Sequence, residues 1–155
     1  MTIKKGTHAP FHLPKILLNT KCLSYEVEFT DSCRYDIGSE DQGDINKLFG
    51  IGYFPSHHYN SVRIGWNYDI PTDKIKLWAY WYDKGQRQWA YLKSVDINTT
   101  HCFSIIMEND EHIIDLGDVT YSVHVKPKLI GYLLRPYFGG NQVAPHDIVI
   151  NFENI

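Results

Sequence analysis

Hydrophobic and polar residues alternate along most of the chain, in short runs separated by turn-forming residues. The clearest run is Leu23–Phe29, in which apolar residues take the odd positions and Ser24, Glu26 and Glu28 take the even ones. No window sustains the i, i+3, i+4, i+7 spacing of a long amphipathic helix. The pattern therefore predicts strands that place one face in a core and the other in solvent.

Turn residues divide this pattern into about ten strands, the number typical of two packed antiparallel sheets. The runs that can be delimited are 23–29, 61–67, 74–82, 86–95, 101–107, 112–115, 119–125, 129–134 and 146–152. The second, third and fourth of these should form a meander, because Asp83–Gly85 suits a short hairpin connection. We expect an all-β protein, a two-sheet antiparallel jelly-roll sandwich that occupies residues 1–155 as a single domain.

Two segments depart from the strand pattern. Asp44–Phe49 predicts one short helical turn, because Asp44 can cap it and Gly50 can end it. Asp31–Gly43 is rich in Ser, Gly, Asp and Glu and predicts a long surface loop. Such a loop is a natural wall for a binding site.

Charge and hydropathy remove several classes of partner. The formal net charge is −3, with basic residues dispersed rather than gathered in a stripe, which disfavours nucleic acid binding. No stretch approaches the roughly 20 apolar residues that span a bilayer, so membrane insertion is not expected. The N-terminus carries no uninterrupted apolar run typical of an export signal, which predicts a cytoplasmic protein unless a signal peptide has been removed. Three dispersed cysteines fit free thiols, with at most one disulfide.

The aromatic content, 14% of the residues, suggests a binding face on the central meander. If the aliphatic positions of these strands face the core, the opposite face collects Arg63, Asn67, Trp78, Tyr80 and Tyr82. Depending on register, either Arg87 or Gln88 joins them. Aromatic planes stack on sugar rings, and planar polar groups bind hydroxyls or carboxylates. The alternative is that these aromatics simply cover the second face of the sheet.

A pair of histidines precedes the first strand of the meander. His57 and His58 should point in different directions in an extended chain, so we expect only one, His58, to share a site with Arg63 or Tyr80. A histidine beside tyrosine and arginine could act in β-elimination on a uronic acid, which requires a base and a neutralised carboxylate. The alternative is a structural, hydrogen-bonded histidine pair.

The sequence contains no signature of a cofactor or metal site. Neither C-x-x-C nor H-E-x-x-H occurs, so we expect no zinc. Calcium remains possible because carboxylates in loops bind it without a strict motif. The candidate calcium donors are Asp36, Glu40, Asp41 and Asp44.

Two segments carry a family resemblance. The tail Leu134–Ile150, with its Pro-Tyr-Phe-Gly-Gly loop, and the run Asn60–Trp66 followed by the Tyr80 strand and Gly85–Arg87, resemble bacterial jelly-roll domains of the concanavalin A-like lectin/glucanase type. The resemblance implies a fold and a binding face but no catalytic set, because such domains include lectins, binding modules, hydrolases and lyases. The E-x-D-x-x-E acids of the hydrolases and the Gln-x-His strand of the alginate lyases are both absent.

These observations lead to three functional hypotheses. The first is a non-catalytic, lectin-like carbohydrate-binding protein that uses Arg63, Trp78, Tyr80, Tyr82, His58 and Asn67. The second is a polysaccharide lyase acting on a uronic-acid polymer, with His58 or Tyr80 as base and Arg63 as neutraliser. The third is a structural or interaction protein, such as a phage or surface-assembly subunit, in which the aromatics form an interface and a homo-oligomer is possible.

Overall fold

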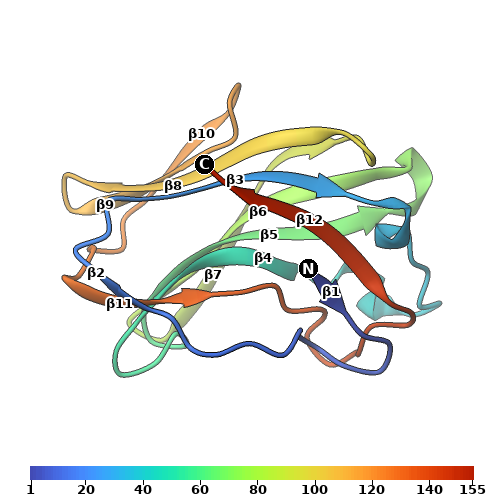
Figure 1. Cartoon of the computed structure of the whole chain (residues 1–155), viewed down its shortest axis with the longest axis horizontal. Helices are drawn as coiled ribbons and strands as arrows, with labels where there is room; N and C mark the ends of the chain where they lie inside the picture. Colours follow the sequence, from blue (N-terminus) through green and yellow to red (C-terminus); the bar gives the residue numbers. More distant parts are fainter.

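The computed structural model describes all 155 residues and contains two six-stranded antiparallel sheets that pack face to face (Figure 1). The first sheet has the order β1-β12-β3-β8-β9-β10, and the second has the order β2-β11-β4-β5-β6-β7. The predicted all-β, two-sheet antiparallel sandwich is confirmed. The strands of the first sheet are β1 (Thr2–Ile3), β3 (Cys22–Phe29), β8 (Thr100–Glu108), β9 (Glu111–Asp115), β10 (Thr120–Val123) and β12 (Ile148–Asn154). Those of the second are β2 (Ile16–Leu18), β4 (Asn46–Tyr53), β5 (Ser61–Asp69), β6 (Lys74–Asp83), β7 (Gln86–Val95) and β11 (Ile130–Leu134).

The helical turn expected at Asp44–Phe49 is wrong, because Asn46–Tyr53 forms the strand β4 between β11 and β5. The register between β4 and β5 shifts between Lys47 and Phe49, so Leu48 and Phe49 are both buried. This bulge breaks the two-residue alternation by which strands are recognised. The short strands β1 and β2 were also missed, and the only helical elements are three 3₁₀ turns at Asp31–Cys33, Glu40–Gly43 and Ile70–Thr72.

The core lies between the two sheets. Val62, Ile64 and Trp66 of β5 are fully buried, as are Ile75 and Leu77 of β6. Opposite them, the first sheet contributes large buried side chains that include Phe29, Phe103 and Ile105. The faces predicted for β5 and β6 are therefore confirmed, and the residues that alternate with this core lie on the outer face of the second sheet.

The register of the meander β5-β6-β7 determines which side chains lie next to one another on the outer face. Lys84 and Gly85 both adopt positive φ, 49° and 84°, as a two-residue type I′ hairpin between β6 and β7 requires. Arg63 of β5 is directly opposite Tyr80 of β6, which in turn is directly opposite Trp89 of β7. These three side chains form one row across three neighbouring strands.

Residues 4–15 run along the edge of the molecule between β1 and β2, below β11 in the view of Figure 1. We call this segment the N-terminal strap. Backbone hydrogen bonds hold it at Gly6, His8 and Lys15 against residues of the C-terminal third of the chain. Asp147 also accepts a bond from the backbone N–H of Lys5 at 2.9 Å. No helix in the structure has the length and hydrophobicity needed to cross a membrane.

Candidate functional site

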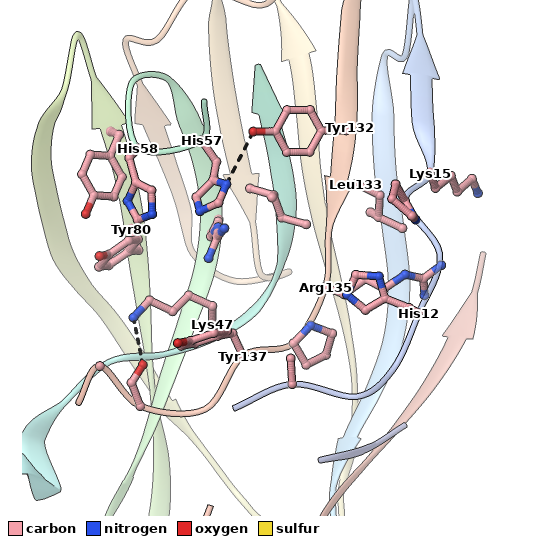
Figure 2. Close-up of a pocket in the computed structure, with 18 of the residues that line it drawn as sticks. His12, Lys15, Lys47, His57, His58, Tyr80, Tyr132, Leu133, Arg135 and Tyr137 are labelled. Atoms are coloured by element: carbon pink, nitrogen blue, oxygen red, sulfur yellow. Dashed lines mark hydrogen bonds between the residues drawn. The ribbon is translucent and has the colours of Figure 1, made fainter. Parts of the chain in front are cut away.

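A cleft of about 810 Å³ opens on the outer face of the second sheet. Its floor is formed by β4, β5, β6 and β11, and its walls by the N-terminal strap, by residues 54–58 and by residues 135–141. In Figure 2, Lys47, Tyr80, His57 and His58 gather on one side of the pocket, and Arg135, His12 and Lys15 on the other. Its volume is typical of a pocket for a small ligand or for a few units of a polymer.

Glycines in β4 create the space for the functional side chains. A Cβ atom at Gly50 would lie 2.2 Å from the carbonyl oxygen of Val62 and 2.8 Å from Cγ of Arg63. A Cβ atom at Gly52 would lie 2.9 Å from the ring of Tyr132 and 3.0 Å from Cβ of His57. The two glycines therefore leave a bare strip of backbone over which the side chains of neighbouring strands lie.

Arg63 forms the centre of the cleft floor. It is 8% exposed, and its buried Nε atom has no hydrogen-bond partner. Burial lowers the pKa of Arg63 to about 10, so the guanidinium stays charged at neutral pH. A buried, charged donor without a partner is costly unless a ligand satisfies it. Arg63 is thus an unsatisfied cation aimed at a space that an anion could fill.

Lys47 stands beside Arg63 because the bulge in β4 turns it to the outer face. Its Nζ atom lies 4.8 Å from the centre of the Tyr80 ring and 3.4 Å from the carbonyl oxygen of Gly139 (Figure 2). Burial, with a smaller contribution from the Arg63 charge, lowers the pKa of Lys47 to about 8. Two desolvated cations therefore share the floor of the cleft.

No acidic side chain lines the cleft, although the whole protein has a net charge of −3. The lining contains five lysines and arginines, none of which forms an ion pair: Lys15, Lys47, Arg63, Arg87 and Arg135. By contrast Arg34, the one arginine outside the cleft, binds both Asp31 and Asp73. Asp44, whose charge opposes the lowering of the Lys47 pKa by burial, does not line the cleft, so the cleft keeps an excess of positive charge on an acidic protein.

Both adjacent histidines line the cleft, so the expectation that only one could reach it is wrong. Residues 54–60 form turns rather than an extended chain, and the two rings lie 4.2 Å apart at an angle of 41°. Burial, followed by the charges of Arg63 and His58, lowers the pKa of His57 to about 4. His57 is therefore a neutral base at pH 7, with its Nδ1 atom 3.5 Å from the hydroxyl of Tyr132 (Figure 2).

Tyrosines supply the flat surfaces of the cleft. The rings of Tyr80 and Tyr82 meet edge to face at 6.0 Å, and His58 packs against Tyr82 at 5.3 Å. Burial raises the pKa of Tyr80 to about 12, so its hydroxyl keeps its proton at neutral pH. Sequence reasoning thus placed Arg63, Tyr80, Tyr82 and His58 correctly on one face, and the structure gathers all four in the cleft.

Two of the predicted site residues lie elsewhere on the same face. Trp78 and Asn67 do not line the cleft, and the indole Nε1 of Trp78 donates to the side-chain oxygen of Asn67 at 2.6 Å. The loop Asp31–Gly43 contributes no residue to the cleft, so its expected role as a wall is wrong. Its Gln42 instead donates to the backbone carbonyls of Tyr35 and Tyr68.

The Pro-Tyr-Phe-Gly-Gly loop of the tail forms one end of the cleft. Buried Asn46 fixes this loop, since its side-chain oxygen accepts a bond from the N–H of Gly139 at 2.5 Å while its amide donates to the hydroxyl of Tyr35 at 2.9 Å. Gly139 adopts a φ of 71°, which favours glycine. The motif thus has a structural role, and it also presents Tyr137 and Gly140 to the cleft.

Sequence reasoning missed the cleft residues that come from outside the meander. Lys47 was missed because its segment was expected to form a helical turn, and His12 and Arg135 lie in segments without a periodic pattern. The pair Gly50 and Gly52 in an otherwise apolar run was the one usable signal, since glycine inside a strand marks a close approach.

No group of three or more His, Cys, Asp or Glu side chains could hold a metal ion, and Asp36, Asp41 and Asp44 each accept hydrogen bonds from protein groups.

No protein-family model and no curated protein matches the chain. Among solved structures, it is similar to the alginate lyase AlyC3 in complex with dimannuronate, with a TM-score of 0.59 and 16% identity over 97% of this chain and 70% of that one. A second AlyC3 structure gives a TM-score of 0.57 and 16% identity over 96% and 65%. The carbohydrate-binding module CBM66 from Bacillus subtilis gives a TM-score of 0.42 and 11% identity over 90% and 74%. At these identities the lyase likeness establishes a shared β-sandwich fold.

Proposed function

We propose that the protein binds an acidic, uronic-acid-containing polysaccharide in this cleft. The observation that carries the proposal is a cleft lining that contains five cations and no carboxylate, with none of the five cations in an ion pair. A neutral sugar would leave these charges uncompensated, whereas a polyuronate would bring one carboxylate with each unit. The concanavalin A-like type of sandwich, suggested by the Pro-Tyr-Phe-Gly-Gly tail, is part of the same proposal.

Each part of the cleft has a role in such binding. Arg63 would receive a carboxylate on the floor of the cleft, where its buried Nε lacks a partner. Tyr80 and Tyr82 would pack on the apolar faces of the sugar rings, since tyrosine combines a flat apolar body with a polar tip. Lys47 and Arg135, on opposite sides of the cleft, would attract the carboxylates of neighbouring units.

The test is a comparison of charged and neutral polysaccharides by calorimetry. Polymannuronate, polyguluronate and polygalacturonate are measured against laminarin and a soluble cellulose derivative without charge. We expect binding of at least one polyuronate, weakened by added salt because the attraction is ionic. Equal affinity for neutral and acidic polymers, or binding of none, would show that the charge of the cleft has another purpose.

A matched pair of variants locates the binding. Arg63→Leu removes a buried and unpaired charge, so affinity should be lost while the melting temperature stays unchanged or rises. Lys21→Ala removes the same charge from a residue outside the cleft that forms no ion pair, and it should bind as the wild type does. Parallel losses in both variants would indicate a general charge effect instead of a site.

A second candidate function, β-elimination, is favoured by one observation, the neutral His57 beside Arg63. With the carboxylate held by Arg63, His57 would take the proton from the carbon next to it. The electron pair would form a carbon–carbon double bond, the bond to the leaving sugar oxygen would break, and a tyrosine hydroxyl such as that of Tyr80 would protonate that oxygen.

The elimination has a direct readout, since the new double bond conjugates with the carboxylate and absorbs ultraviolet light. His57→Ala should then lower kcat by about 100-fold or more with binding retained. His58→Ala is the matched control and should keep a kcat close to that of the wild type, because His58 packs on Tyr82 and is more exposed than His57. No absorbance change with any bound polyuronate would leave the protein as a binder without catalysis.

A further inference from the structure

A second aromatic surface adjoins the cleft on β7, the edge strand of the sheet. Trp89 and Tyr91 are 51% and 52% exposed, although both are large aromatic residues. Neither lines the cleft. We call Trp89 and Tyr91 the edge platform.

The edge platform shares a face and a register with the cleft. Trp89 is directly opposite Tyr80, and Tyr91 is opposite Trp78, with which its ring makes an edge-to-face contact at 5.5 Å. Since neighbouring strands lie about 4.8 Å apart, the row from Arg63 through Tyr80 to Trp89 extends roughly 10 Å from the centre of the cleft to the edge of the sheet. A polymer that crosses the strands along this row would leave the cleft over Trp89.

The charge pattern continues across the boundary between the two surfaces. Arg87 lines the cleft, and its guanidinium lies 5.2 Å from the centre of the Trp89 ring. Arg87 forms no ion pair with an acidic residue. The edge platform thus repeats the combination found in the cleft, a flat aromatic ring beside an uncompensated cation.

From this continuity we infer that the edge platform is an additional binding subsite, which holds sugar units of the same acidic chain beyond those in the cleft. The inference rests on the proposed function and adds the direction of the polymer, across the strands from β4 toward β7. It follows that affinity depends on chain length. A disaccharide fits within the cleft, and only a longer oligosaccharide reaches Trp89.

The experiment compares uronate disaccharides and hexasaccharides, of whichever polyuronate binds, on wild type, Trp89→Ala and Gln88→Ala. Gln88 is the matched control because it is exposed on the same edge strand, and its side chain points to the opposite face. We expect Trp89→Ala to weaken hexasaccharide binding by about 3- to 10-fold, as loss of one aromatic contact would. Disaccharide binding should be unchanged, and Gln88→Ala should match the wild type for both ligands. If the hexasaccharide is cleaved, KM replaces the affinity in each comparison.

The possible outcomes separate the two proposals. If wild type binds both oligosaccharides and Trp89→Ala binds the hexasaccharide equally well, the edge platform is refuted while the cleft stands. If wild type binds neither oligosaccharide, the proposed function fails and the platform fails with it. Sedimentation of the wild type is measured in parallel. A stable dimer that dissociates in Trp89→Ala would show that a second copy of the chain covers β7, and this result would also overturn the inference.

Discussion

The substitution Gly50→Ala tests whether the cleft depends on the absence of side chains at Gly50 and Gly52 of β4. Its φ is not in the left-handed region, so the cost of Gly50→Ala is steric. The added methyl group would lie 2.2 Å from the carbonyl oxygen of Val62 and 2.7 Å from Cα of Arg63, and neither backbone atom can rotate away. Methyl groups forced into a packed site cost about 1–3 kcal/mol, and contact with backbone on a central strand favours the upper half of that range.

A loss of about 2–3 kcal/mol in a chain of this size corresponds to a fall of roughly 4–12 °C in melting temperature. Differential scanning calorimetry measures the fall, and urea unfolding gives the free energy independently. Because the displaced strand carries Arg63, affinity for a polyuronate should fall as well.

The matched control is Gly43→Ala. Gly43 is exposed and does not require positive φ, and a methyl group added there would meet no heavy atom within 4 Å. Its substitution should therefore change stability by no more than about 0.5 kcal/mol. If Gly50→Ala melts at the temperature of Gly43→Ala and of the wild type, the close approach of β4 to β5 does not shape the cleft as argued.

Three further predictions concern buried and titrating groups. Tyr53→Phe removes the 2.7 Å bond to Nε2 of buried His112 and should cost about 1–3 kcal/mol in urea unfolding at pH 7, whereas equal stability would show that the bond is dispensable. Burial lowers the pKa of His112 to about 4, below its unfolded value near 6.5. The free energy of unfolding should therefore be highest above pH 6.5 and should fall by about 3 kcal/mol as the pH drops toward 4. A free energy of unfolding that stays constant between pH 6.5 and 4 would contradict the lowered pKa of His112. Since the pKa of Lys47 is lowered to about 8, the affinity for a polyuronate should decline between pH 7 and 9 as Lys47 loses its charge. Lys47→Arg should remove that decline, because arginine stays charged over this range. If the decline is the same in Lys47→Arg, a group other than Lys47 causes it.

The sequence was most informative where the alternation of side chains is strict. In β5 and β6 every second residue is apolar and enters the core, so the faces, the meander and the grouping of Arg63 with Tyr80 followed from periodicity. In β4 the same reasoning failed because of a bulge between Lys47 and Phe49 and because glycines occupy the outward positions. A strand with a register shift and no outward side chains has no period of two to detect.

The composition of the cleft could not be read from the sequence for a different reason. Its cations come from the N-terminal strap, a bulged strand, the meander and the tail, and these segments meet only through the pairing of β2, β11, β4 and β5. That Arg34 is paired while Arg63 is unpaired is likewise a property of the packing. Counting charges along the chain gave a dispersed pattern, which concealed this local excess.

This local excess also links stability to binding. Arg63 and Lys47 are desolvated near one another, and burial lowers the pKa of each, which means that the folded state disfavours their charged forms. Such a cost persists at sites where a ligand relieves it, since a pair of apolar side chains would fill the same space with less strain on the fold. An acidic ligand would supply the counter-charge and the hydrogen-bond acceptors together. Its binding should therefore stabilise the folded protein beyond the contribution of shape alone, and the melting temperature should rise with the concentration of the acidic ligand.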